Sequence, residues 1–208
     1  MIQASRISAN HSGWMTGAFT IAITADHCQI PSTRGEMPAK FCSQCGSTLS
    51  TGIESGRERP ICPRCGFVVY RNPVPVALVL ITAEDGLLLV HRRHAPLANY
   101  WAPPAGYIEI DESLEEGAAR EVKEETGLEV AIDRLLHVYS RANAGVILVT
   151  FAAHVCGGKM AGAEAEVLDL RFFRPQELPD QPEPVQGMLL EQWFYEVIGE
   201  VFAQFRKA

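Results

Sequence analysis

The sequence lacks a long hydrophobic run. No stretch of about 18 apolar residues occurs, which is the length that a membrane-spanning helix needs. The longest candidate, WMTGAFTIAIT at residues 14–24, is too short to span a membrane. Only Arg6 precedes it as a basic residue, which makes a poor start for a secretory signal. We therefore expect no association with a membrane.

Positive charge is also scarce. The chain has 18 Lys and Arg residues against 25 Asp and Glu residues, for a net charge of -7. Such a balance argues against sequence-independent binding of nucleic acid or of an anionic membrane surface. Magnesium could still bridge an acidic site to a phosphate-bearing substrate.

The length allows one hydrophobic core and a small second module. The chain has 208 residues and is 47% hydrophobic. Residues 1–36 show no sustained periodicity, and we expect them to be a disordered extension or the product of an upstream start, with Met37 as a natural first residue. Residues 37–71 form the expected small module, and residues 72–208 the main domain with a C-terminal helix.

Cysteine is too rare and too regularly placed for a disulfide scaffold. Four of the six cysteines, Cys42, Cys45, Cys62 and Cys65, form two C-x-x-C-G pairs separated by 16 positions. This spacing is typical of zinc knuckles, and four thiolates close the coordination sphere, so the predicted zinc is structural. The module resembles a zinc ribbon; the alternative is four free cysteines in a loop.

The remaining cysteines, Cys28 and Cys156, are interpreted as ordinary free thiols. Thiolate ligands suit a reducing compartment, which predicts a cytoplasmic protein. The ribbon carries five basic residues but, by sequence, no interleaved aromatics suited to stacking on bases, which again argues against nucleic acid as a partner.

The main domain alternates strands with helices. We expect a buried strand within residues 71–83, a turn at 84–86, and a return strand at 87–93. A helix is expected over 112–126, ended by Gly127. Further strands are expected at 128–140, 146–155 and 166–173, then a helical turn at 174–178 and a helix from about 185 to 205. The apolar stripe of this last helix predicts core packing, with a partner-binding surface as the alternative. The class is α/β or α+β with a mixed sheet.

The helix over 112–126 stacks negative charge. Glu121, Glu124 and Glu125 fall within one narrow arc, and like charges at this spacing destabilise a helix. Arg120 can pair with Glu124 but cannot neutralise all three. A divalent cation is the simplest missing counter-charge, because clustered carboxylates suit magnesium. The alternative is a solvated acidic face.

The spacing of these residues favours the metal site. Residues 106–128 match G-x5-E-x7-R-E-U-x-E-E-x-G-U, where U is aliphatic. A chance match is on the order of 10^-7 at average residue frequencies. The stretch resembles the Nudix box, the signature of the Nudix hydrolases, and residues 106–128 are called the box below. This resemblance implies an α/β/α sandwich with a mixed sheet, and hydrolysis of a nucleoside diphosphate linked to another moiety.

The resemblance also implies roles for individual residues. Glu121, Glu124 and Glu125 would bind magnesium or manganese, with the carbonyl of Ala105 or Gly106 as a further ligand. Arg120 would orient the glutamates. The general base would be a box glutamate or Glu166 on a later loop, with Glu164 as the fallback. For Glu166 and Glu164, an exposed loop charge is the alternative.

Ribbon and box together resemble the zinc-ribbon Nudix group that includes FAD and ADP-ribose pyrophosphatases. The family pattern implies that Arg92 and Glu109 flank the pyrophosphate or a further metal; for Arg92, a surface arginine is the alternative. Pro103 stands where the group usually has Leu, and Asp111 where it usually has Gly. These departures concern the substrate loop.

The leading expectation is therefore magnesium-dependent hydrolysis of FAD or ADP-ribose, releasing AMP. A second zinc-ribbon group hydrolyses NADH and NAD caps on RNA and carries S-Q-P-W-P-F-P-x-S after the box. Nothing like this stretch occurs here, so an NADH or NAD-cap pyrophosphatase ranks second. A nucleotide-sensing Nudix module is the alternative of another class, and an RNA-processing enzyme is a third. The resemblance also implies that the protein could form a homodimer.

Overall fold

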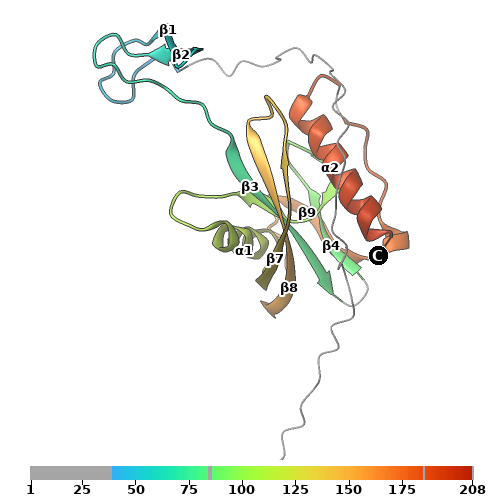
Figure 1. The fold of residues 1–208 in the computed structure, drawn as a ribbon. Coiled ribbons are helices and arrows are strands. Elements are labelled where there is room, and N and C mark those ends of the chain that lie inside the picture. Colours follow the sequence, from blue (N-terminus) through green and yellow to red (C-terminus); the bar gives the residue numbers. More distant parts are fainter. Residues whose placement is uncertain (1–38, 84–85, 185, 208) are drawn as a thin grey trace, which may run out of the picture.

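A seven-stranded mixed sheet forms the centre of the larger domain (Figure 1). The computed structural model describes residues 39–83, 86–184 and 186–207. The sheet has the order β5-β4-β3-β8-β7, with β6 paired to β3 and β9 paired to β4. Its strands are β3 (Val74–Ala83), β4 (Gly86–Arg92), β5 (Trp101–Ala102), β6 (Ala105–Tyr107), β7 (Leu128–Ser140), β8 (Val146–Gly158) and β9 (Val167–Phe173). β3 and β8 are parallel, whereas β3 pairs antiparallel with β4 and β6, which confirms the predicted mixed sheet.

Alternate residues of the central strands face opposite layers. On β3, Ala77 and Val79 pack in the same cluster as α1 (Leu114–Thr126), and Leu78 packs in the same cluster as α2 (Leu189–Phe205). Because both faces of the sheet are covered, β3 and β4 consist of nearly continuous apolar residues. Figure 1 shows the two helices on opposite sides of the sheet. The predicted α/β/α sandwich is therefore confirmed.

Helix α1 begins two residues later than expected. Ser113 has extended backbone angles and accepts a hydrogen bond from the Glu116 N–H, while the Glu116 side chain accepts one from the Ser113 N–H. This capping box places the first helical residue at Leu114 rather than at residue 112. Ala118 and Val122 are fully buried against the sheet, as their helical spacing predicts.

Helix α2 begins at Leu189, about four residues later than expected. Gly187 has a φ of 81°, which is incompatible with a right-handed helix at that point. The apolar stripe of α2 is mostly core: Trp193, Val197, Ile198 and Val201 are each at most 5% exposed. Core packing is thus confirmed for most of the stripe. Leu190 and Phe194 are the members that stay only partly buried.

The other predicted elements agree with the structure to within a few residues. β8 continues to Gly158, three residues beyond its expected end, and the helical turn is a short 3-10 helix, η1 (Pro175–Glu177). The expected extension at 1–36, the apolar stretch at 14–24, Cys28 and two residues of the expected turn, 84–85, lie outside the described residues. In the described part of the chain, no helix has the length and apolarity to cross a membrane.

A glycine comparison tests the end of α1. Gly127 has a φ of 71°, and a Cβ there would lie 2.5 Å from the Lys159 carbonyl oxygen; Gly145 has a φ of 76° with open space around it. We expect Gly145→Ala to lower the free energy of unfolding by about 1 kcal/mol, through the left-handed backbone alone. Gly127→Ala should cost at least ~2 kcal/mol, because the steric clash adds to the same backbone term. Urea unfolding of both variants checks this, and equal losses would contradict the described packing at Gly127.

Candidate active site

The small module is built from two matching turns that carry the cysteine pairs. A two-stranded antiparallel sheet, β1 (Ser50–Glu54) and β2 (Arg57–Ile61), connects the turns. The Gly46 N–H donates to the Cys42 carbonyl, and the Gly66 N–H donates to the Cys62 carbonyl. Both glycines have a left-handed φ, near 70°, so the backbone can turn back sharply after each pair.

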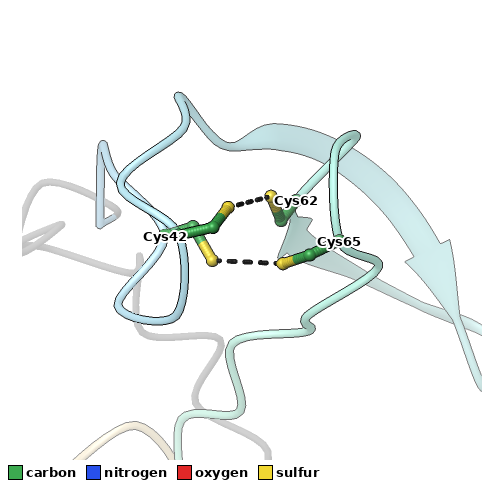
Figure 2. Close-up of side chains that lie close together, drawn as sticks. Cys42, Cys62 and Cys65 are labelled. Atoms are coloured by element: carbon green, nitrogen blue, oxygen red, sulfur yellow. Dashed lines mark hydrogen bonds between the residues drawn. The ribbon is translucent and has the colours of Figure 1, made fainter.

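The four cysteine sulfurs converge on one point. Cys42 Sγ lies 3.6 Å from Cys65 Sγ, and Cys45 Sγ lies 3.5 Å from Cys62 Sγ, as Figure 2 shows in part. All four sulfurs lie within 4.8 Å of one another. Four thiolates in this arrangement fit a structural zinc ion and leave no open coordination position. Cys156 is exposed and free, as expected.

Arg120 holds the acidic end of α1 together. Its Nη1 donates to Glu121 (2.8 Å) and Glu124 (3.0 Å), and its Nη2 and Nε donate to Glu112 (2.7 and 2.9 Å). Nη2 also donates to the Tyr107 carbonyl at 2.9 Å. Arg120 thus pairs with three carboxylates, whereas the sequence predicted a pair with Glu124 alone. The hydrogen bonds from Arg120, with one from the Glu109 N–H, lower the pKa of Glu112 to about 2.

Glu125 lies apart from this arrangement and deeper in the protein. It is 5% exposed, accepts a hydrogen bond from the Ala105 N–H (3.1 Å), and lies 3.6 Å from Arg92 Nη1. Burial raises the pKa of Glu125 to about 7, although Arg92 opposes the shift. Burial also raises the pKa of Glu121, with neighbouring carboxylates adding to it. The nearby arginines therefore do not fully offset the negative charge of Glu121 and Glu125.

Two glycines of the box lie directly against carboxylates. A Cβ at Gly106 would overlap the carboxylate of Glu121, so only glycine allows that side chain to lie beside the β6 backbone. A Cβ at Gly117 would meet Glu112 Oε1 and Ile108 Cδ1 at 2.6 Å. The space beside Gly117 is therefore filled by Glu112 and Ile108.

The donor set fits a hard divalent cation. Carboxylate oxygens from Glu121 and Glu125 and the backbone of Gly106 line one cavity, and magnesium prefers such oxygen ligands. In the described part of the chain, the glutamates do not converge as closely as the cysteines do. The reason is electrostatic: Arg120 holds Glu121 and Glu124, while Arg92 and the Ala105 N–H hold Glu125.

A cavity of about 240 Å³ opens beside this cluster. The candidate residues that line it are Arg92, Ala105, Gly106, Glu121, Glu125 and Glu166. Glu166 is thus brought next to the box from a distant loop, whereas the fallback Glu164 does not line the cavity.

Three further candidates also lie outside the cavity lining. Glu124 is 58% exposed, and Arg120 acts through its carboxylate partners. The exposed Glu109 donates its N–H to Glu112 and contributes no side chain to the cavity. That Glu109 flanks the pyrophosphate or a further metal stays a prediction.

Two loops are tied together at the mouth of the cavity. The Arg93 N–H donates to the Glu166 carbonyl (2.9 Å), and His94 Nε2 lies 2.8 Å from the Ala165 carbonyl oxygen. Arg92 Nε donates to the Pro96 carbonyl at 3.3 Å. These bonds keep Arg92 and Glu166 at the same cavity, although 74 positions separate them (166 minus 92).

The apolar lining of the cavity was missed by sequence reasoning. Leu97 from the loop after β4, and Phe194, Val197 and Ile198 from α2, line the side away from the box. The α2 residues belong to the stripe assigned to core packing. Only the aromatic character of Phe194 distinguishes it from its neighbours in sequence, and that signal is too common to identify a site.

An acidic helix on an α/β/α sandwich, preceded by a four-cysteine ribbon, defines a class of metal-assisted hydrolases. Residues 72–192 match the family model described as NUDIX domain, and residues 40–71 match the one described as Nudix N-terminal, a zinc ribbon. The chain belongs to the Nudix hydrolase family. The resemblance stated from the box residues and the cysteine spacing is thereby confirmed.

Relatives carry two kinds of name. The NAD-capped RNA hydrolase NudC of Stutzerimonas stutzeri is 31% identical over 163 residues, covering 77% of this chain and 58% of that protein. The ADP-ribose pyrophosphatase of Methanocaldococcus jannaschii is 34% identical over 118 residues, covering 54% and 69%. A NUDIX hydrolase structure from Nitrosomonas europaea has a TM-score of 0.65 at 32% identity, covering 77% and 91%. The chain spans a little over half the length of the NAD-capped RNA hydrolases of Stutzerimonas stutzeri and Chromobacterium violaceum.

Zinc content tests the ribbon. We expect about one zinc ion per chain by atomic absorption, because four thiolates complete one tetrahedral site. Cys62→Ser removes a buried ligand and should abolish stoichiometric zinc. Cys156→Ser is the matched control, since it removes an exposed free thiol and should leave the zinc content unchanged. Full zinc content in the Cys62 variant would refute the site.

The pH dependence of stability tests Glu125. Its pKa of about 7 lies above the ordinary value of 4.5, so the contribution of this carboxyl to stability is greatest below pH 4.5 and is lost as the pH rises through 7. In EDTA, Glu125→Gln should therefore raise Tm at pH 8, and the gain should shrink toward pH 5. Glu115→Gln, at an exposed position on α1, should show no such trend. A gain that is constant from pH 5 to 8 would contradict the assignment.

Proposed function

We propose that this Nudix hydrolase cleaves the diphosphate of an adenine dinucleotide, with NADH and NAD-capped 5′ ends as its first substrates. The observation that carries the proposal is the cavity itself, which joins an acidic cluster to an apolar recess. An acidic cluster suits a metal-neutralised diphosphate, and an apolar recess suits a flat ring.

The names of the relatives support this order of substrates. NAD consists of ADP-ribose joined to nicotinamide, so both kinds of name share the ADP-ribosyl diphosphate. This reverses the ranking drawn from sequence, in which FAD or ADP-ribose preceded NADH because the S-Q-P-W-P-F-P-x-S stretch is missing. None of the relatives reported above has FAD in its name.

The residues of the cavity have these proposed roles. Glu121, Glu124 and Glu125, with the Gly106 carbonyl, would hold magnesium or manganese. When bound, the cation would offset charge on the diphosphate and lower the pKa of a coordinated water. Arg92 faces the cavity and would contact a phosphate oxygen. Arg120 would keep Glu121 and Glu124 oriented through its hydrogen bonds.

Glu166 is the proposed general base. It lines the same cavity as Glu121 and Glu125 and would accept a proton from the attacking water. The water oxygen bonds to the adenylyl phosphorus as the P–O–P linkage breaks, and the products from NADH are AMP and reduced nicotinamide mononucleotide. A box glutamate in this role is the alternative.

ADP-ribose is the second candidate substrate. The relative named ADP-ribose pyrophosphatase is covered over 69% of its length, a larger share than is covered of the NAD-capped RNA hydrolases. The missing S-Q-P-W-P-F-P-x-S stretch favours the same candidate.

An RNA-bearing substrate is favoured by one surface of the ribbon. Phe41 and Tyr70 are 65% and 56% exposed, and the Arg59 guanidinium lies 4.6 Å from the centre of the Tyr70 ring. Sequence analysis found no interleaved aromatics in the ribbon, whereas one exposed ring, Tyr70, lies beside the basic Arg59, which supports a stacking role for this surface.

Several expectations from sequence remain proposals. The division between ribbon and Nudix domain at residues 71 and 72 is supported by the meeting point of the two family matches. The cytoplasmic location and the homodimer stay predictions.

A hydrolysis panel tests the function. The purified protein with magnesium should cleave NADH to AMP and reduced nicotinamide mononucleotide, and NAD-capped RNA to a 5′-monophosphate RNA. ADP-ribose should follow, with FAD as a comparator. Glu124→Gln should lower kcat/KM at least 100-fold through loss of a metal ligand. Liquid chromatography of the products measures each rate.

The matched control is Glu115→Gln, which removes an exposed carboxylate from the same helix and should retain activity within about threefold. Cleavage of FAD alone would refute the proposed substrate order. Nucleotide binding without any cleavage would favour the sensing module over the enzyme.

A further inference from the structure

The cavity has two chemically different ends. The charged end consists of Glu121 and Glu125 of α1, with Arg92 and Glu166 close to Glu125. The apolar end consists of residues from the core clusters that contain α2: Leu78, Leu97, Phe194, Val197 and Ile198. The polar end is assigned above to metal and diphosphate. The apolar end has no role in that chemistry.

The apolar wall is rigid where it joins the core and accessible at one aromatic ring. Val197 and Ile198 are each 3% exposed, so they fix α2 against the sheet. Phe194 is only partly buried although it packs against two core clusters. The buried Trp193 stacks on it, with ring centroids 5.6 Å apart and an angle of 17° between the planes. Phe194 is thus a supported ring with surface left to contact a ligand.

Hydrogen bonding cannot identify a ligand at this end. The lining side chains from β3, the loop after β4 and α2 are all apolar. The polar side chains of the lining come from α1, from Tyr107 of β6, from Arg92 at the end of β4 and from Glu166 in the loop before β9. A ring held at the apolar end would be recognised by stacking and by shape.

We propose that Phe194 is the stacking platform for a nucleoside ring of the substrate, and that α2 thereby sets the affinity for that nucleoside. The inference rests on the proposed function, since it places the diphosphate at the acidic end of the same cavity. The ring lies on α2 while the phosphates extend toward Arg92 and the box.

The proposed platform lies after the end of the family match. The NUDIX match ends at residue 192, and Phe194, Val197 and Ile198 all follow it. The box determines the reaction, and a segment outside the matched region contributes the nucleoside contact.

Steady-state kinetics with NADH tests the platform. Loss of a base–aromatic stack corresponds to about a 5- to 150-fold loss of affinity. Phe194→Ala and Phe194→Leu should raise KM by about tenfold or more, with kcat within about threefold, because the stack holds ground state and transition state alike. Phe194→Trp keeps a ring and should stay within about threefold of the wild type in KM.

The matched control is Phe202→Leu. Phe202 is a buried residue of the same helix that does not line the cavity. This variant should lower Tm while leaving KM for NADH unchanged. It separates loss of the platform from loosening of α2.

A binding measurement separates the platform from the proposed reaction. Calorimetric titration with AMP and with ribose 5-phosphate, which lacks a base, needs no catalysis. The wild type should bind AMP at least tenfold more tightly than ribose 5-phosphate, and Phe194→Ala should remove most of that preference. Equal preference in both proteins, with both folded by circular dichroism, would overturn the platform. If the preference behaves as expected but NADH is not cleaved, the platform stands and the proposed function fails.

Discussion

The bonds of Arg120 to three carboxylates and one carbonyl are the interaction on which the site depends. A single guanidinium contacts Glu112, Glu121, Glu124 and the Tyr107 carbonyl, so it links the loop before α1 to successive turns of that helix. The planar fork of arginine suits this use, because a lysine ammonium lacks the geometry to bind several oxygens along one edge. The acceptors raise the pKa of Arg120 above its usual range, so its charge is permanent. Without it, the carboxylates would repel one another away from the cavity.

The repulsion among the clustered carboxylates is unfavourable, and the packed core of the domain offsets it. The carboxylates beside the cavity outnumber Arg92 and Arg120, and Glu125 is almost fully buried. Their cost must be offset elsewhere, and the two layers of apolar residues on the faces of β3 and β4 are the main source. Destabilised active sites supported by well-packed scaffolds are a common compromise between stability and activity. Helix α1 belongs to both the scaffold and the active site: Ala118 and Val122 pack in the core, and the carboxylates lie on another face.

Sequence reasoning predicted the structure best where it depends on local spacing. The i, i+3 and i, i+4 relations of Glu121, Glu124 and Glu125 determine their common arc in any helix, and the C-x-x-C-G pairs determine the two turns of the ribbon. It was weaker where the site is assembled by long-range pairing. Arg92 and Glu166 meet because β4 pairs with β9, and only the family resemblance had singled them out. Phe194 could not be separated from core residues, because helical periodicity describes a stripe and not what covers each member of it.

The parallel pairing of β3 and β8 has a consequence for the order of assembly during synthesis. Paired residues such as Val74 and Val146 are 72 positions apart (146 minus 74), so the centre of the sheet cannot form until β8 has emerged from the ribosome. The facing cysteines Cys42 and Cys65 are only 23 positions apart. The ribbon can therefore close while the rest of the chain is unfinished. Helix α2 is translated last of the described elements, so α1 and the strands of the sheet are synthesised before the wall that completes the cavity.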